Sequence, residues 1–513
     1  MGTKKTVFWG SLCFLVLVSL SAGNEDVWDR SVNKYSTILS LVEQNYYRDV
    51  EAEKLIYSSI RGMLETLDPH SYFLDPDNLS RMREEYTGKY YGLGIQIQKH
   101  GDRLVVIAPI EGTPASRLGI QPGDVISTIN GESTKPLTSF DAMQKLRGPK
   151  GTKVTITIIR EGLEKPLELT IEREEIPLHS VAYAFMLDDR TGYIFIRNFA
   201  ETTTEEFEQK MAELSGKGMK QLILDLRGNT GGPFFQSIAL SDEFLPKGDV
   251  IVSIKGRNKV YNREFRAQKD GQFEDIPLVV LINRGSASAS EIVSGAIMDN
   301  DRGYIVGEDS WGKGLVQTVF PLGENLAVAL TTAKYFTPSG RSIQRDYEHI
   351  EDYMLYKRAP EDQREVRYTA KGRKVLGQGG IAPDYQVASS LKNFTLELMI
   401  KGAFFGFARK FAVRETGNSG GSGRVSVGRD FVVGTAILED FKSYLRATKM
   451  DFDEAGFKEA ETEIKRELER EIVSSLWGQE EGVRAYRKSD AVVLKALEIM
   501  PEASKFVADA RSR

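Results

Sequence analysis

Ser288 lies in a segment whose residues suit a nucleophilic serine. The run LINRGSASASEIVSGAIMDN predicts a buried strand, a turn of small residues and then a helix. A serine at such a junction exposes its hydroxyl, and the free N–H groups at the start of the helix can stabilise an oxyanion. A second interpretation stays open, because Ser288-Ala-Ser-Glu291 also reads as a capping box in which the serine only caps the helix. Taken alone, the pattern favours capping.

Lys313 is the candidate base, and it stands between two glycines in YIVGEDSWGKGLVQTVF. A lysine acts as a base only when it is neutral, and an ordinary pKa near 10.4 leaves about a thousandth of it neutral near pH 7.5. Burial in a dry pocket lined by Trp311, Leu315 and Val316 can lower that pKa. Gln317, four residues on, can orient the amine through its amide oxygen. Without Ser288, a solvated lysine on a turn is the simpler interpretation.

The run LILDLRGNTGGPFF predicts a strand that ends at two glycines, Gly231 and Gly232. Their N–H groups can complete an oxyanion hole together with the N–H of Ala289. Pro233 suits the first position of a following helix. Two glycines also suit an ordinary strand-to-helix turn, so this segment by itself decides little.

A phosphate-binding loop is a competing interpretation of the lysine segment. Gly307 to Lys313 reads GxxxxGK and follows a predicted strand. However, Gly314 stands where a Ser or Thr must hold magnesium, so the match is taken as coincidence. We expect an activity that needs no nucleotide.

The composition excludes several other classes of function. The 513 residues include 68 Lys and Arg against 73 Asp and Glu, and no basic stretch with interleaved aromatics indicates a nucleic-acid partner. The single cysteine, Cys13, lies in an N-terminal apolar stretch, which excludes disulfides and cysteine chemistry from the mature chain. No metal-site spacing joins the four histidines, and none lies near the segments above in the sequence: His70, His100, His179 and His349. We expect no metal and no other cofactor.

The first residues predict export. Lys4 and Lys5 precede an apolar stretch over residues 7–22, and small residues follow it, which is the three-part form of a secretory signal. The stretch is near the lower limit for spanning a bilayer, so it is either a cleaved signal or an uncleaved membrane anchor. Both place the remaining chain outside the cytoplasm, in the periplasm or cell envelope.

Changes in periodicity divide the chain. Helical spacing predicts an N-terminal helical region over 24–88, and alternation with turns such as GIQPGD predicts a β-rich domain over 89–173. Strands then alternate with helices over 174–390, as in an α/β domain. A charged helical region follows over 391–513, with a Gly/Ser linker at 417–423 and an apolar stripe that packs a local core or a dimer contact. Residues 1–23 form the signal or anchor.

Several motifs in order resemble the carboxyl-terminal processing peptidases, or tail-specific proteases. Over most of residues 30–390 these are LDPHSYFLDP, YYGLGIQI, GIQPGDVISTINGE, DLRGNTGG, GSASASEI, GKGLVQT, KYFTPSGRSIQ and GGIAPD. The resemblance implies a multidomain α+β fold, in which a Clp protease/crotonase-like α/β core carries an inserted PDZ domain between helical terminal regions. It also implies that Ser288 is the nucleophile, Lys313 its base and Gln317 the residue that orients the lysine, while Asp299 has a structural role.

The chain departs from the family pattern at two positions. Pro233 follows the glycines where an aliphatic residue is common, and Trp311 stands where phenylalanine is usual. Neither change removes a catalytic group.

The PDZ-like segment suggests how a substrate is held. The loop Gly92-Leu93-Gly94-Ile95 offers N–H groups to a terminal carboxylate, and the adjoining strand edge can pair with an extended peptide. An apolar last side chain would then contact Leu93 and Ile95, opposite Met143 and Leu146 of the helix SFDAMQKL. A purely structural β-domain is the alternative.

These observations predict a serine endopeptidase that cleaves exported proteins near their C-termini, with the PDZ domain recognising apolar C-terminal tails. An adaptor or activator protein and a second copy of the chain are further partners to expect. The alternative is a catalytically silent PDZ adaptor in the cell envelope. A histidine-dependent PDZ protease fits less well, since nothing resembling its serine motif occurs, and the SxxK run Ser31 to Lys34 lacks its accompanying motifs.

Overall fold

The computed structural model describes residues 25–323, 325–388, 391–417, 427–450 and 452–511. The predicted signal or anchor and residues 418–423 of the predicted linker therefore lie outside the described residues. The chain divides into two compact units, residues 1–67 and 68–513. Among the described helices, none is both long enough and apolar enough to cross a membrane.

Two helices make up the described part of the first unit: α1 (Glu25–Asn45) and α2 (Ala52–Glu65). They carry the helical spacing that the sequence indicated. Apolar side chains nevertheless remain exposed along α1, including Trp28, Ile38 and Leu41. Only Leu64 of α2 is buried.

The second unit begins with a short strand and a helix, β1 (Tyr72–Leu74) and α3 (Pro76–Thr87). An antiparallel pair, β2 (Lys89–Gly92) and β9 (Glu174–Pro177), then brackets a separate β-domain. Its sheet has the order β3-β4-β5-β7-β8, with β6 paired to β5, so β3 is an edge strand. The elements of this domain are β3 (Ile95–His100), β4 (Arg103–Pro109), α4 (Pro114–Arg117), β5 (Val125–Ile129), β6 (Glu132–Ser133), α5 (Ser139–Leu146), β7 (Lys153–Ile159) and β8 (Leu167–Glu172).

The central sheet of the unit has the order β10-β11-β12-β15-β16-β21, parallel from β11 onward. Its strands are β10 (Val181–Met186), β11 (Thr191–Ile196), β12 (Gln221–Asp225), β15 (Leu278–Ile282), β16 (Tyr304–Gly307) and β21 (Tyr385–Gln386). Because neighbouring strand residues face opposite sides, Leu222 and Leu224 join one core while Ile223 joins another. The sheet is therefore covered on both faces.

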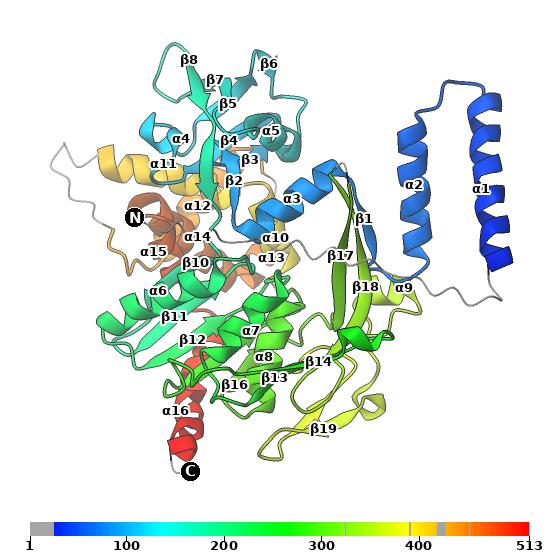
Figure 1. Ribbon diagram of the computed structural model, residues 1–513. Helices are drawn as coiled ribbons and strands as arrows, with labels where there is room; N and C mark the ends of the chain where they lie inside the picture. Colours follow the sequence, from blue (N-terminus) through cyan, green and yellow to red (C-terminus); the bar gives the residue numbers. More distant parts are fainter. Residues whose placement is uncertain (1–24, 324, 389–390, 418–426, 451, 512–513) are drawn as a thin grey trace, which may run out of the picture. The chain divides into compact units, whose positions relative to one another are not determined.

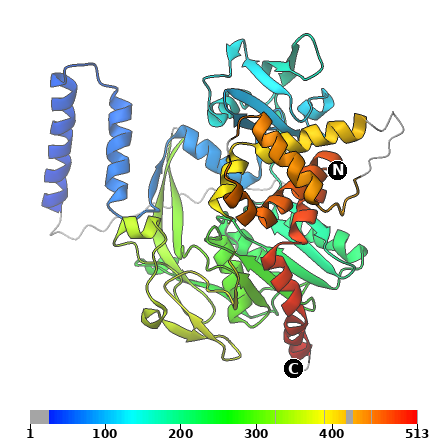
Figure 2. The same cartoon turned by 180° about the vertical axis from the view of Figure 1, so that it is seen from behind.

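Helices from two distant parts of the sequence cover this sheet. On one face lie α6 (Thr203–Gly216), α7 (Phe234–Asp242) and α8 (Ala289–Asp299), while α16 (Ala491–Arg511) covers the other (Figures 1 and 2). Val492, Val493 and Ala496 of α16 are fully buried against strands β12, β15 and β16. The C-terminal region thus supplies one layer of the core.

A second, smaller sheet stands beside the first and has the order β1-β18-β13-β14, with β17 also paired to β18. Its strands besides β1 are β13 (Val250–Lys255), β14 (Arg263–Arg266), β17 (Leu315–Gly323) and β18 (Leu326–Phe336). β18 pairs with β1 through Tyr72 and Ala329, which brings the LDPHSYFLDP segment beside strands encoded far later in the chain.

The remaining elements surround these sheets. A local core buries Ile464, Leu468 and Ile472, with Leu476 packed against it, so the predicted apolar stripe packs within this chain. The elements are η1 (Lys259–Tyr261), α9 (Ile350–Met354), η2 (Glu361–Gln363), β19 (Val366–Tyr368), β20 (Lys374–Leu376), α10 (Asn393–Ile400), α11 (Ala403–Gly417), α12 (Thr435–Ala447), α13 (Glu454–Glu459), α14 (Glu461–Trp477) and α15 (Gln479–Arg487).

Candidate active site

Ser288 stands at the turn from β15 into α8 in an unusual backbone conformation. Its φ of 54° and ψ of −112° are strained for a residue with a side chain. Its amide donates to Glu291 Oε2 at 2.8 Å, so the Glu291 half of the predicted capping box is present. A strained residue between a buried strand and a buried helix is typical of a nucleophile elbow.

The double-glycine loop packs directly against this turn. A Cβ at Gly231 would lie 2.8 Å from the Cβ of Ser288 and 3.0 Å from the amide nitrogen of Ala289. Further bonds fix the loop, since Ala287 N–H and the Ser290 hydroxyl both donate to the carbonyl oxygen of Asn229 at 2.9 Å. The two segments that sequence reasoning assigned to the oxyanion hole are therefore neighbours.

The N–H groups around this loop differ in whether they already have a hydrogen-bond acceptor. Gly231 N–H donates to Asn229 Oδ1 at 2.9 Å. Within the described ranges, the amides of Gly232 and Ala289 have no hydrogen-bond acceptor. Pro233 lies just before α7 and caps it, so the prediction that it occupies the first helical position is wrong by one residue.

Lys313 belongs to a loop between β16 and β17, and several hydrogen bonds join this loop to the serine turn. One oxygen of Glu291, Oε2, accepts the amide hydrogens of Ser288 and Lys313, and its Oε1 accepts that of Gly312 at 2.6 Å. The buried Tyr335 hydroxyl donates to the Lys313 carbonyl at 2.6 Å and lies 3.2 Å from that of Ser288. These contacts hold the two backbone segments side by side.

The Lys313 side chain is half-buried, and its charge is disfavoured. Burial lowers the pKa of its ammonium group, while the nearby carboxylates of Glu291 and Asp68 act in the opposite direction. The net direction is downward, toward the neutral amine that a base requires.

Gln317 lies on β17, where it pairs in register with Thr331 of β18. Its Nε2 donates to the Thr331 hydroxyl at 3.2 Å. The amide NH₂ group therefore points to β18, which leaves the amide oxygen for another donor.

His70 comes close to the site in space, although no histidine lies near its motifs in the sequence. Burial, together with the nearby charge of Lys313, lowers the pKa of His70 to about 4. Its Nε2 lies 2.8 Å from the hydroxyl of Tyr353, which also accepts from Trp311 Nε1 at 3.0 Å. His70 is therefore distant from the catalytic motifs along the sequence but close to Lys313 in space. The only sequence signal was its place in LDPHSYFLDP.

Asp299 lies at the far end of α8, away from the serine. Its Oδ1 accepts from Arg341 at 2.8 Å, both side chains are fully buried, and Ser339 donates to Oδ2 at 2.6 Å. The two residues form a fully buried ion pair at this end of the helix.

In the β-domain, the proposed peptide-binding residues lie around the edge strand. Leu93 and Leu146 are buried in the domain core, Ile95 packs against that core, and Met143 is half-buried on α5 beside β3. Gly94 has a φ of 77°, and a Cβ there would overlap Thr113. The loop thus requires glycine at this position.

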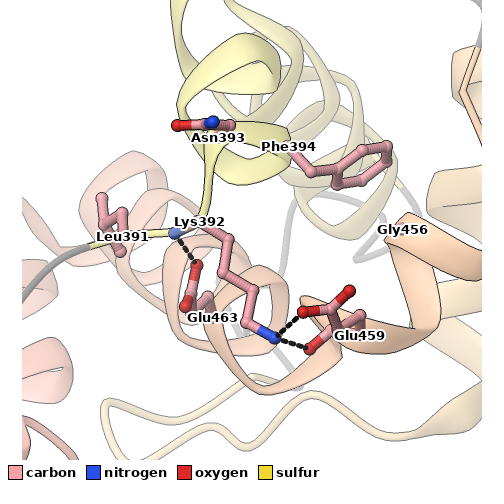
Figure 3. A pocket seen from close by; sticks show the side chains of 7 residues that line it. All are labelled: Leu391, Lys392, Asn393, Phe394, Gly456, Glu459 and Glu463. Atoms are coloured by element: carbon pink, nitrogen blue, oxygen red, sulfur yellow. Dashed lines mark hydrogen bonds and ion pairs between the residues drawn. The ribbon is translucent and has the colours of Figure 1, made fainter.

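A cavity of about 540 Å³ lies elsewhere, between α10, α13 and α14 (Figure 3). Lys392 donates to Glu459 at 2.8 Å and Glu463 accepts from the Lys392 amide at 2.9 Å, so these polar groups already have partners. It shares no residue with the serine and lysine segments.

Comparison with known proteins assigns the chain to a family. Residues 190–352 match the model of peptidase family S41, residues 81–159 that of the PDZ domain, and residues 18–78 that of the activating protease CtpB N-terminal domain. The carboxy-terminal-processing protease of Bartonella bacilliformis is 39% identical over 342 residues, which cover 66% of this chain and 78% of that protein. The chain belongs to the carboxy-terminal processing proteases of peptidase family S41.

Two further proteins are similar to this chain. The carboxy-terminal processing protease CtpA of Bacillus subtilis is 35% identical over 318 residues, or 62% of this chain and 67% of that one. The solved photosystem II D1 C-terminal processing protease is 28% identical, with a TM-score of 0.38, and the match covers 71% of this chain and 88% of that one. The predicted family, fold class and enzyme class are confirmed: this protease is a serine peptidase with a PDZ domain.

Proposed function

We propose that this protease cleaves proteins near their C-termini through a Ser288–Lys313 dyad. The observation that carries the proposal is the shared acceptor, Glu291 Oε2, to which the amides of both residues donate at 2.8 and 2.9 Å. Two segments held by one buried oxygen can present their side chains to each other. The lowered pKa of Lys313 suits its role as base.

The proposed reaction has two stages. The neutral Lys313 amine takes the proton of the Ser288 hydroxyl as its oxygen attacks the substrate carbonyl, and the ammonium then protonates the departing amine. An acyl-enzyme remains, and a water activated by the same amine hydrolyses it. The amides of Ala289 and Gly232 stabilise the oxyanion in both stages, and Gly231 provides the close approach that its missing Cβ permits.

Gln317 has the role of orienting Lys313 in this proposal. Its NH₂ group is engaged by Thr331, so its oxygen can accept a hydrogen bond from the lysine amine. A fixed amine direction matters because proton transfer requires a hydrogen-bond geometry with the serine.

Cleavage of parent, Ser288→Ala and Lys313→Ala proteins tests the dyad. An unfolded protein substrate that ends in an apolar residue is incubated with each, and fragments are followed by mass spectrometry. We expect both variants to lose activity by about 1,000-fold or more. Cleavage by Lys313→Ala at the parental rate would remove the base assignment. A parent that binds the substrate but never cleaves it would favour the silent adaptor.

We further propose that the PDZ domain holds the substrate by its C-terminal tail. β3 ends its sheet, so an extended peptide can pair along its outer side, and Leu93, Ile95, Met143 and Leu146 supply apolar surface near the Gly94 loop. Amidating the substrate C-terminus should raise KM by about 10-fold, since charge-assisted bonds to the carboxylate are lost. An unchanged KM would contradict tail recognition.

The predicted location and partners also remain proposals. The apolar residues 7–22 favour export to the periplasm or cell envelope, with or without retention as an anchor. The match of residues 18–78 to an activating-protease N-terminal domain supports an adaptor or activator partner, and the exposed apolar side chains of α1 support self-association. The presence of protein in a membrane or periplasmic fraction distinguishes the two forms of export.

A further inference from the structure

A chain of hydrogen bonds leads from Gln317 away from Lys313 to a carboxylate at the other edge of the smaller sheet. Gln317 Nε2 donates to the Thr331 hydroxyl at 3.2 Å, and that hydroxyl donates to Asp68 Oδ1 at 3.1 Å. Thr331 lies on β18, between β17 and the segment that precedes β1. The three residues come from parts of the sequence that no local pattern connects.

The direction of each bond in this chain is fixed by chemistry. An ionised carboxylate only accepts hydrogen bonds, so Thr331 must give its single hydroxyl proton to Asp68. The threonine oxygen can then only accept, and it therefore requires a donor from Gln317, which must be the NH₂ group. The amide oxygen of Gln317 is left to face the other way. Reversing any one bond would turn the NH₂ group toward the lysine, where it cannot accept a hydrogen bond.

Asp68 is itself held firmly. The amides of His70 and Ser71 both donate to its Oδ1 at 2.8 Å, and the Ser71 hydroxyl donates to its Oδ2 at 2.7 Å. Ser71 also accepts the amide hydrogen of Thr331 at 3.0 Å, which fixes the turn against β18. The carboxylate is therefore held in one orientation. The hydrogen bonds that lead from it through Thr331 to Gln317 then run in one donor-to-acceptor direction.

We propose that Asp68 and Thr331 are positioning residues that set which end of the Gln317 amide faces Lys313. This inference rests on the proposed function, because it presumes that Gln317 orients the lysine. It also gives a role to the start of the motif LDPHSYFLDP, to which the sequence analysis attached no function.

The threonine hydroxyl can be removed with little change of shape. Thr331→Val lacks it, Thr331→Ser retains it, and Thr332→Val is the matched control, since the Thr332 hydroxyl pairs with Thr318 at 2.8 Å instead. We expect Thr331→Val to lower kcat by about 10- to 100-fold with KM nearly unchanged, as for a lost orienting contact. Thr331→Ser and Thr332→Val should keep most of the parental kcat.

Asp68→Asn tests the polarity directly, because an asparagine can donate as well as accept. Four groups bear on the lysine charge: the buried apolar surroundings, the carboxylates of Glu291 and Asp68, and His70, which is neutral above about pH 4. Loss of the Asp68 charge should shift the acid limb of the kcat/KM profile to lower pH and reduce kcat. The loss of charge alone moves only the limb, so an unchanged kcat on the plateau of the profile would contradict the positioning role.

The outcomes distinguish a failure of this inference from a failure of the proposed Ser288–Lys313 dyad. If Thr331→Val or Asp68→Asn keeps the parental kcat and pH profile while Lys313→Ala and Gln317→Ala lose activity, the inference is wrong and the dyad stands. Equal losses in Thr331→Ser and Thr331→Val would also overturn it. Activity in Lys313→Ala at the parental level would instead remove the proposed function. If Thr331→Val melts well below Thr332→Val, unfolding would explain its lost activity. The kcat and pH profile of Asp68→Asn then decide whether the inference holds.

Discussion

The amide groups of Ser288 and Lys313 donate to the same carboxylate oxygen, Oε2 of Glu291, at 2.8 and 2.9 Å. Glu291 is fully buried, which raises its pKa, and it also accepts from Ser310 at 2.5 Å and Gly312 at 2.6 Å. The residue that sequence reasoning could assign only to a helix cap thus joins the two segments of the site.

Glu291→Gln should therefore damage both folding and activity. A glutamine keeps the shape, but its NH₂ group would face N–H donors and leave at least one of them unsatisfied in the interior. We expect a loss of about 1–3 kcal/mol in the free energy of unfolding, measured in urea, with greatly reduced cleavage. Glu351→Gln, at an exposed position of α9, serves as control and should change neither. Parental activity in Glu291→Gln would contradict the linking role.

The pH dependence of cleavage should follow Lys313. Burial lowers its pKa, so the neutral fraction, and with it kcat/KM, should rise with pH and level off below the ordinary lysine value near 10.4. Lys313→Arg keeps a charged side chain that cannot deprotonate, and we expect it to be inactive at every pH. The measurement is kcat/KM against pH for both proteins. Activity that declines across neutral pH as pH rises would exclude a lysine base.

Removal of the same lysine should stabilise the protein. Because the folded-state pKa lies below the unfolded value, the unfolded chain binds more protons between the two, and stability from this group rises with pH there. Below that window the buried charge is most costly. We expect Lys313→Met to raise the free energy of unfolding by about 1 kcal/mol at pH 6, and by less at pH 10. A destabilised variant at pH 6 would contradict this prediction.

The packing of α16 on the central sheet gives a further prediction. Val493 is fully buried against the strands, while its neighbour Leu494 is 48% exposed. Val493→Asp places an unpaired charge in the core and should cost about 4 kcal/mol or more, with loss of activity. Leu494→Asp should leave the melting temperature and cleavage nearly unchanged. Similar behaviour of the two variants would show that α16 does not cover the sheet in solution.

Local patterns in the sequence predicted the parts of the fold that depend on neighbours along the chain. The strand-turn-helix around Ser288, the glycines beside it and the continuous apolar runs of β12 and β15 are all short-range features. The structure adds what these patterns cannot contain. Asp68 meets Thr331, Tyr335 reaches Lys313, and α16 lies on β15, each across many intervening residues.

The functional assignments differ in the same way. Ser288, Lys313 and Gly231 stand in motifs that a reader of the sequence can find. In contrast, no motif contains Thr331, and the motif KYFTPSGRSIQ contains Tyr335 without indicating its partner. Their polar side chains resemble those of any half-buried strand until the partner strand is known. The position of His70 along the sequence gives no sign of its closeness to Lys313 in space.

An ion pair joins the segment just before α16 to the residue that precedes the double-glycine loop. Arg227 directly precedes the Gly228–Gly232 turn and donates to Asp225 of β12 and to Asp490, just before α16. Ribosomal synthesis delivers the serine, the lysine and the glycines well before Asp490 exists. A nascent or truncated polypeptide would then hold the proposed catalytic groups without the layer that α16 supplies, and we expect proteolysis only once the whole unit has folded.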